Sequence, residues 1–253
     1  MKKILVLLVI GLLIIFTISG CNGVIPGEGE GEGEGEGEGE PEPDKVTVLV
    51  EAYVAVGCTH CAEVEPYLEQ LAGKYSRDEM ILVELIPWGS NYVIPEAYSR
   101  YQWYDLSGGV PQITFNGLNN NIYGAWPYYV IKNRIEAQLA VTPTIELEAS
   151  RTTTSSGTVI TGKVKNISSG TLTNLVVNGM TIKNRGITGF HYSVTDIFED
   201  EKYTISSLAA GEEVNFTITI DGLNWDGQNL DGVVFVQSVS HPKKVIRQSV
   251  FLN

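Results

Sequence analysis

Apolar and polar positions alternate with two different rhythms along the chain, and the change falls near residue 143. Before this point, apolar runs of strand length alternate with stretches whose apolar residues recur every three to four positions, the period of an α-helix. The runs predict strands at residues 45–56, 80–86, 110–115 and 121–123, and the helical period predicts helices at 61–75, 95–104 and 128–139. The predicted order over residues 45–142 is therefore β-α-β-α-β-β-α.

After residue 143, Thr, Ser, Val, Gly and Asn dominate and the helical period is lost. Short apolar or alternating runs are separated by turn signals such as Asn178-Gly179. The predicted strands are 145–147, 159–164, 172–177, 191–196, 214–220, 233–239 and 245–252. Regularly spaced short strands between Gly and Asn turns are typical of a β-sandwich.

Two segments, Lys163–Asn166 and Leu208–Glu212, give this second half a generic similarity to immunoglobulin-like modules of bacterial surface proteins. Its sequence contains no catalytic constellation. We expect an immunoglobulin-like all-β sandwich domain at residues 143–253, which serves as a spacer, a folding partner or an arm that docks a substrate.

Residues 1–21 have the features of an export signal. A positive start, Met1–Lys3, precedes an apolar stretch from Ile4 to Ile18 and the small residues before Cys21. The end of this segment resembles the bacterial lipobox, with Ile18 where Leu is commoner, and the resemblance implies that Cys21 carries the lipid. An uncleaved membrane anchor is the alternative, although the stretch is slightly short of the ~20 residues that span a bilayer. Either reading places the rest of the chain outside the cytoplasm, where disulfides persist.

Residues 22–44 are strongly acidic and contain seven consecutive Gly-Glu units between residues 27 and 40. The Gly-Glu run has no apolar side chain to bury, so it predicts a flexible linker that like charges extend. An acidic tail that binds cations or a partner is the alternative. The segment carries nine of the negative charges behind the net charge of −13, and the remainder is only mildly acidic. No basic stripe occurs, so we expect no nucleic-acid partner.

The candidate chemistry lies in Cys58-Thr59-His60-Cys61, between a predicted strand and a predicted helix. Two thiols at this spacing form a pair that one chain can open and close. If Cys21 is acylated, Cys58 and Cys61 are the two thiols that remain. A disulfide that stays permanently closed is the alternative, although such a small loop crosslinks little of the chain.

The sequence disfavours a zinc site or a c-type haem site at this motif. Zinc needs four ligands, and the other histidines, His191 and His241, lie in a different segment. A c-type haem site needs His directly after the second Cys, where Ala62 stands. We therefore expect no metal and no cofactor.

Three local features together resemble the thioredoxin family over about 95 of the 253 residues. They are the Cys58–Cys61 motif between strand and helix, Pro66 five residues after Cys61, and Val110-Pro111 downstream. The resemblance implies an α/β thioredoxin-like domain with a central mixed sheet at 45–142, followed by the sandwich. Gly57 departs from the pattern, since the family usually has an aromatic residue there.

The position of the motif also suggests separate roles for its residues. A Cys at a helix N-terminus faces unpaired N–H groups and the positive end of the helix dipole, which favours the thiolate. Cys58 is therefore the predicted nucleophile, and Cys61, one turn into the helix, resolves the mixed disulfide. A protonated His60 would stabilise the Cys58 thiolate and make the disulfide more oxidising.

The resemblance implies further site residues outside the motif. It places Pro111 in a cis-proline loop beside the dithiol, with Val110 and Thr59 in contact with an incoming peptide. It makes Glu51 a candidate proton relay for Cys61, although Glu51 lies seven residues before Cys58 where the family commonly has six.

The sequence therefore predicts a lipid-anchored thiol–disulfide oxidoreductase of the cell envelope that acts on thiols and disulfides of exported proteins. Oxidant, isomerase and reductase remain open, and a membrane redox partner is a further expectation for the reductase. The alternative is a non-catalytic thioredoxin-like binding module of the cell surface with a structural disulfide.

Overall fold

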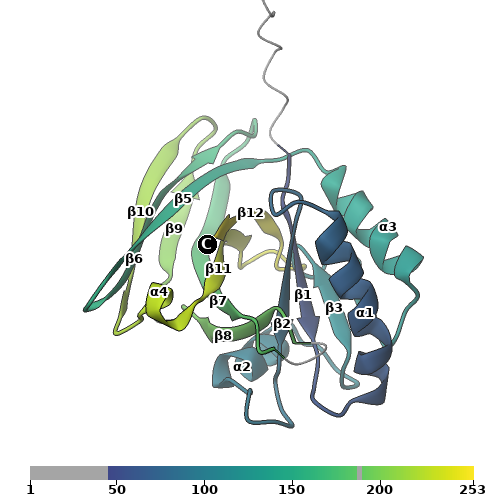
Figure 1. Cartoon of the computed structure of the whole chain (residues 1–253). Coiled ribbons are helices and arrows are strands. Elements are labelled where there is room, and N and C mark those ends of the chain that lie inside the picture. Colours follow the sequence, from purple (N-terminus) through teal and green to yellow (C-terminus); the bar gives the residue numbers. More distant parts are fainter. Residues whose placement is uncertain (1–44, 187–189) are drawn as a thin grey trace, which may run out of the picture. The chain divides into compact units, whose positions relative to one another are not determined.

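The computed structural model describes residues 45–186 and 190–253 (Figure 1). The predicted signal segment, the acidic linker and Cys21 lie outside the described residues. The described residues group into one compact unit. Among the described residues, no helix is long and apolar enough to cross a membrane.

The first part of this unit is built on a buried central strand. Its strands are β1 (Val48–Tyr53), β2 (Met80–Leu85), β3 (Gln112–Phe115) and β4 (Ile122–Tyr123). Strand β1 pairs in parallel with β2 and antiparallel with β3, which pairs with β4. Every residue of β1 and β2 is buried, which explains why both read as continuous apolar runs rather than as an alternating pattern.

Helices cover both faces of these strands (Figure 1). Helices α1 (Thr59–Lys74) and α3 (Tyr128–Leu139) share a core with Val48, Val50 and Ala52 of β1. Helix α2 (Pro95–Trp103) packs on the opposite face, against Leu49 and Tyr53. The alternation of side chains along β1 thus sends neighbouring residues into different cores.

The second part consists of long antiparallel strands and one short helix. These elements are β5 (Ile145–Thr154), β6 (Gly157–Asn166), β7 (Leu172–Lys183), β8 (Ser193–Ile197), β9 (Tyr203–Leu208), β10 (Glu213–Asp221), α4 (Trp225–Gln228), β11 (Asp231–Ser238) and β12 (Ile246–Leu252). Strand β9 and helix α4 were absent from the sequence prediction. Strands β10, β6 and β5 form a separate three-stranded sheet.

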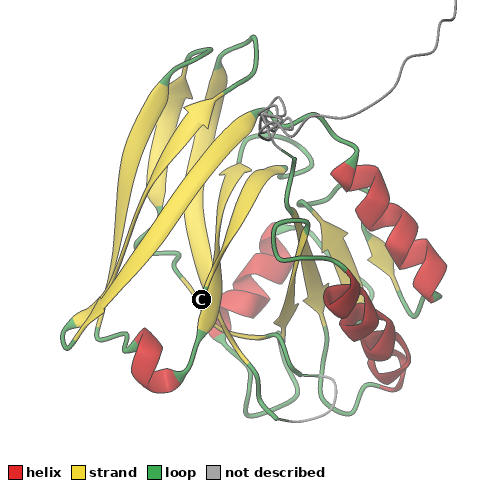
Figure 2. Ribbon diagram, turned by 45° about the horizontal axis from the view of Figure 1, so that its top comes forward, coloured by secondary structure: helices red, strands yellow, loops and turns green. Residues whose placement is uncertain are grey.

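The remaining strands of both parts join in one nine-stranded mixed sheet. Its order is β12-β11-β7-β8-β2-β1-β3-β4, with β9 also paired to β7. Strands predominate throughout, and the described residues contain only four short helices (Figure 2). The fold class that the sequence predicts, an α/β thioredoxin-like domain followed by a separate all-β sandwich, is therefore wrong.

The physical reason for this difference lies at the outer edge of β2. An unpaired strand edge presents free N–H and C=O groups that another strand can satisfy. Here the backbone N–H of Glu84 donates to Tyr192 O at 2.8 Å, and Glu84 pairs in parallel with Ser193 of β8. A hydrophobic pattern predicts that a strand is buried, but it does not name the strand beside it.

A buried ion pair lies between the two parts of the unit. The guanidinium Nε of Arg100 on α2 donates to the carboxylate of Glu51 on β1 at 2.5 Å, and both side chains are almost fully buried. The hydroxyl of Tyr104 donates to the same carboxylate at 2.7 Å. Nη2 of Arg100 donates to Gln237 on β11 at 3.3 Å. Although burial alone lowers the pKa of Arg100, Glu51 raises it above its ordinary value, so the pair stays charged.

Replacing Glu51 by Gln is expected to destabilise the protein by about 3–5 kcal/mol, because it leaves the Arg100 charge buried without a carboxylate. Urea unfolding of the full chain measures this loss. The double variant Glu51→Leu/Arg100→Met should be more stable than Glu51→Gln, since it removes both charges. Glu199→Gln breaks an exposed pair with Lys202 and serves as the control, with an expected loss of about 1 kcal/mol or less. A Glu51→Gln loss no larger than that control would contradict this account.

Candidate functional site

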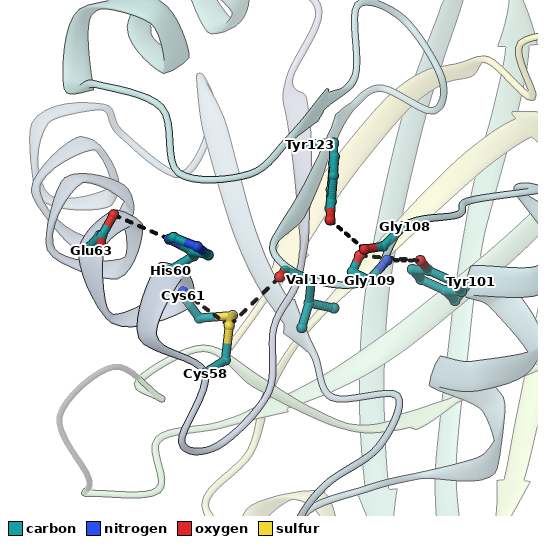
Figure 3. Close-up of a disulfide and its surroundings, with 9 residues drawn as sticks. All are labelled: Cys58, His60, Cys61, Glu63, Tyr101, Gly108, Gly109, Val110 and Tyr123. Atoms are coloured by element: carbon teal, nitrogen blue, oxygen red, sulfur yellow. Dashed lines mark hydrogen bonds and ion pairs between the residues drawn. A yellow bond between two sulfur atoms is a disulfide. The ribbon is translucent and has the colours of Figure 1, made fainter.

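Cys58 and Cys61 form a disulfide at the N-terminus of α1, with their Cα atoms 5.2 Å apart (Figure 3). Cys58 is the N-cap residue, and its sulfur accepts a hydrogen bond from the N–H of Cys61 at 3.2 Å. Cys58 is half-buried, whereas Cys61 is only 1% exposed. The sulfur that a partner can reach is therefore that of Cys58, and a thiolate there would face the positive end of the helix dipole.

The turn before Cys58 explains why Gly57 stands where the thioredoxin family usually has an aromatic residue. Gly57 has φ +77°, a left-handed conformation that residues with a side chain rarely adopt. This turn takes the chain from β1 into α1, and the N–H of Cys58 donates to the carbonyl of Ala55 at 3.2 Å. An aromatic residue at this position would be strained, so the local backbone accounts for glycine.

A loop before β3 lies against the disulfide. The carbonyl oxygen of Val110 is 3.7 Å from Sγ of Cys58, and the Val110–Pro111 peptide bond is cis (Figure 3). Val110 is half-buried and Pro111 is buried. The structure thus places Val110 next to Cys58, and Pro111 follows Val110 in the same loop.

Two tyrosines that sequence reasoning did not single out hold this loop in place. The hydroxyl of Tyr101 accepts from Gly109 N at 3.3 Å and lies 3.2 Å from Gly109 O. The hydroxyl of Tyr123 donates to Gly108 O (Figure 3). Both tyrosines stand outside the motif, and their spacing in the sequence contains no signal of a shared loop.

His60 and Thr59 occupy the solvent side of the motif. Thr59 is the first residue of α1 and is exposed. Nδ1 of His60 lies 3.6 Å from the carboxylate of Glu63, and their side chains are 69% and 56% exposed. When His60 is protonated, Glu63 is placed to pair with it.

Glu51 lies on the wrong face of the sheet for the role that the resemblance implies. Val50 and Ala52 share a core with Cys61, whereas Glu51 points to the opposite face and pairs with Arg100. The alternation of side chains along β1 separates the carboxylate from the sulfurs. The structure therefore does not support a direct proton relay from Glu51 to Cys61.

Two other carboxyl groups, Glu84 and Glu65, lie on the side of the sheet where Cys61 is buried. Glu84 is the register partner of Ala52, which puts its fully buried side chain on that face. Burial raises the pKa of Glu84 to about 8. Glu65 lies one turn after Cys61 on α1, and burial together with Glu69 raises its pKa to about 7. Glu84 interrupts the apolar run of β2, a signal that sequence reasoning overlooked.

The raised pKa of Glu84 makes stability depend on pH. The ordinary carboxyl ionises near 4.5, so between about pH 4.5 and 8 the unfolded chain releases a proton that the folded protein keeps. The contribution of neutral Glu84 to stability is fully present below about 4.5 and is lost as pH rises through about 8. We expect the urea midpoint to fall from pH 5 to pH 8, and Glu84→Gln to reduce that fall. The exposed Glu63→Gln variant should keep the wild-type slope, and an unchanged slope in Glu84→Gln would contradict the assignment.

Metal chemistry gains no support from the described part of the chain. Within residues 45–186 and 190–253, no group of three or more His, Cys, Asp and Glu side chains is arranged to hold a metal ion. His191 instead lies 2.8 Å from the carboxylate of Glu69.

No protein-family model matches the chain, and no curated protein matches it. Among solved structures, the chain is similar to HBP35 of Porphyromonas gingivalis, with a TM-score of 0.65 at 16% identity, over 82% of this chain and 74% of that chain. A domain of the outer membrane lipoprotein Omp28 from Porphyromonas gingivalis gives a TM-score of 0.31 at 15% identity, over 45% of this chain and 89% of that domain. β-Glucosidase 3B from Thermotoga neapolitana gives a TM-score of 0.29 at 12% identity, over 44% of this chain and 16% of that chain.

The likeness to HBP35 is one of fold. It covers 82% of the chain and therefore extends well beyond residues 45–142, through strands of both parts of the sheet. This agrees with one large mixed sheet and not with a self-contained thioredoxin-like domain.

Proposed function

We propose that the chain is a thiol–disulfide oxidoreductase that exchanges the Cys58–Cys61 pair with thiols and disulfides of exported proteins. The observation that carries this proposal is the asymmetry of the two sulfurs. Cys58 is accessible and caps a helix N-terminus, and Cys61 is buried directly behind it. An accessible, helix-capping cysteine with a resolving partner is the arrangement that thiol–disulfide exchange requires.

The exchange needs only the two sulfurs and the partner's own pair. In the reducing direction, the Cys58 thiolate attacks a disulfide of the partner, which releases one partner thiolate and forms a mixed disulfide. The Cys61 thiolate then attacks the Cys58 sulfur, releases the second partner thiolate and closes the Cys58–Cys61 disulfide. Two electrons pass to the partner, whose thiolates take up the two protons from the cysteines. The oxidising direction is the reverse.

Exposed apolar side chains just before the motif and next to the loop that lies against Cys58 favour a protein partner. Val56, Tyr123 and Trp126 are all exposed. Val56 precedes the motif by two residues, and Tyr123 is bonded to the loop that lies against Cys58. The indole N–H of Trp126 donates to the carbonyl of Tyr123 at 2.9 Å, which keeps the two rings on one segment. Apolar groups gathered at a surface often mark where a partner binds.

The envelope is the proposed location, and the sequence supports it. The lipobox-like end at Cys21 implies a lipid anchor, the acidic linker of residues 22–44 supplies reach, and an oxidising compartment lets the disulfide persist. A membrane electron donor is the proposed partner if the protein works as a reductase.

Replacing Cys61 by Ala should trap mixed disulfides between Cys58 and exported proteins, because no thiol remains to resolve them. Non-reducing electrophoresis of membrane extracts from cells that express the full-length chain detects the adducts. Cys58→Ala is the matched control and should trap none, since it removes the accessible sulfur and leaves the buried one. Equal absence of adducts from both variants would count against the proposal. A reduction potential of the pair below about −300 mV would point instead to the structural disulfide of the non-catalytic alternative.

His60→Ala should make the reduction potential of the pair more negative by about 30 mV or more, equivalent to about tenfold in the exchange equilibrium. The reason is that the imidazolium stabilises the Cys58 thiolate and so the reduced form. Equilibration with glutathione redox buffers at pH 6 and pH 8 measures the shift in the reduction potential. Lys132→Gln, a charge change on α3, is the control. A His60→Ala potential equal to the wild type at both pH values would remove His60 from the mechanism.

A further inference from the structure

A second site candidate lies at the opposite end of β1 from the disulfide. A cavity of about 460 Å³ opens beside Val46, which precedes β1, whereas Cys58 follows the end of that strand. Four segments meet there: the start of β1, the turn after β3, the residues after α3 and the loop between β11 and β12. The volume is in the range of small-molecule sites.

The ionisable side chains that line this cavity are basic. His241, Lys243 and Arg247 contribute to it, and no Asp or Glu is among its described lining residues. Amide and hydroxyl groups complete the polar lining, including Gln138 on α3 and Asn119 after β3.

Arg247 is the least compensated charge of this group. Its Nε donates to Oγ of Ser238 at 2.6 Å, and Nη1 donates to Oγ1 of Thr144 at 3.2 Å, so both partners are neutral. The side chain is half-buried, and among residues 45–186 and 190–253 no carboxylate lies within ion-pair distance of it. Burial lowers the pKa of Arg247 without an acid nearby to offset it. A half-buried charge without a counter-ion costs stability, which an anion in the cavity would restore.

Backbone hydrogen bonds fix the loop that carries His241 and Lys243 and the start of β12, where Arg247 lies. Leu118 N donates to Lys243 O at 2.8 Å, and Ile246 N donates to Asn116 O at 3.1 Å. The loop lies so close to Gly117 that a side chain there would collide with the backbone of Lys244. A site built on fixed backbone loses little entropy when a ligand binds.

His241 is oriented to donate. Its Nδ1 accepts a hydrogen bond from the backbone N–H of Lys243 at 3.1 Å, which leaves Nε2 as the ring nitrogen that carries a proton. Lys243 itself is exposed, and among the described residues it has no ion-pair partner. The cavity therefore offers a guanidinium, an ammonium and neutral N–H donors from several elements.

We propose that this cavity binds a phosphate-bearing ligand, with Arg247 and Lys243 as its charged contacts. Two cations match a dianion, and donors that approach from the β11–β12 loop, α3 and the turn after β3 can satisfy the oxygens of a tetrahedral group. A carboxylate, with one charge and two oxygens in a plane, would leave part of this set unused. The site is independent of the disulfide chemistry proposed above.

Calorimetric titration of the full-length chain with inorganic phosphate tests the site, with sodium chloride at equal ionic strength as the reference. Phosphate should bind, and Arg247→Gln should weaken its affinity at least tenfold. Arg151→Gln is the matched control, because Arg151 is paired with Asp226 outside the cavity, and it should bind phosphate like the wild type. Without phosphate, Arg247→Gln should unfold at the same urea concentration as the wild type or at a higher one. Loss of an arginine with a purely structural role would instead lower the urea concentration at which the protein unfolds.

Lys243→Gln decides the question if Arg247→Gln does not fold, because Lys243 is exposed and its removal leaves the core intact. It should weaken phosphate binding several-fold. Phosphate binding no stronger than the chloride reference, or equal in wild type, Lys243→Gln and Arg151→Gln, would overturn the proposal. Vesicles that contain phosphatidic acid, whose headgroup is a phosphate monoester, separate the two sources of the ligand. If wild-type vesicle binding exceeds that of Lys243→Gln and phosphate displaces it, the ligand is a lipid headgroup. If phosphate binds and the vesicles do not, the ligand is a soluble phosphate compound.

Discussion

The ion pair of Glu51 and Arg100 is the interaction on which the arrangement of the sheet depends most. Its two charges lie almost fully out of water, on β1 and α2, and β11 reaches the pair through Gln237. Two buried charges are tolerable only when each satisfies the other and neighbouring donors complete the set. Any displacement of β11 from β1 and α2 would break this network, so the pair favours one packing of the two parts.

The same alternation that directs Glu51 to one face of β1 directs Val50 and Ala52 to the other face, into the core that holds Cys61. Residues 48, 50 and 52 of β1 pack against α1, and the chain then turns at Gly57 so that Cys58 becomes the N-cap. The disulfide therefore rests on a rigid scaffold of strand and helix while one sulfur stays accessible. Rigid support with one open side is what a site for reversible covalent exchange needs.

The two ends of β1 differ in the side chains that lie beside them. At the end that follows the strand lie the exposed side chain of Val56 and the Cys58–Cys61 disulfide. At the end that precedes it, Arg247 lines a cavity without an acid. Both surfaces are assembled from segments far apart in the chain.

The sequence by itself determined the local elements and the reactive motif. The apolar runs at β1 and β2 and the helical period of α1 lie within a few residues of their predicted ranges, because burial and period act over neighbouring residues. Cys58 and Cys61 were identifiable from their spacing between a strand and a helix, and Val110-Pro111 from the resemblance to a known family. The structure was needed to show which strand completes the edge of β2, which face receives Glu51 and which distant segments line the cavity beside Arg247. Those outcomes depend on pairing between segments that are far apart in the sequence. Hydrophobic periodicity predicts that a strand is buried, but it does not predict which strand pairs with it.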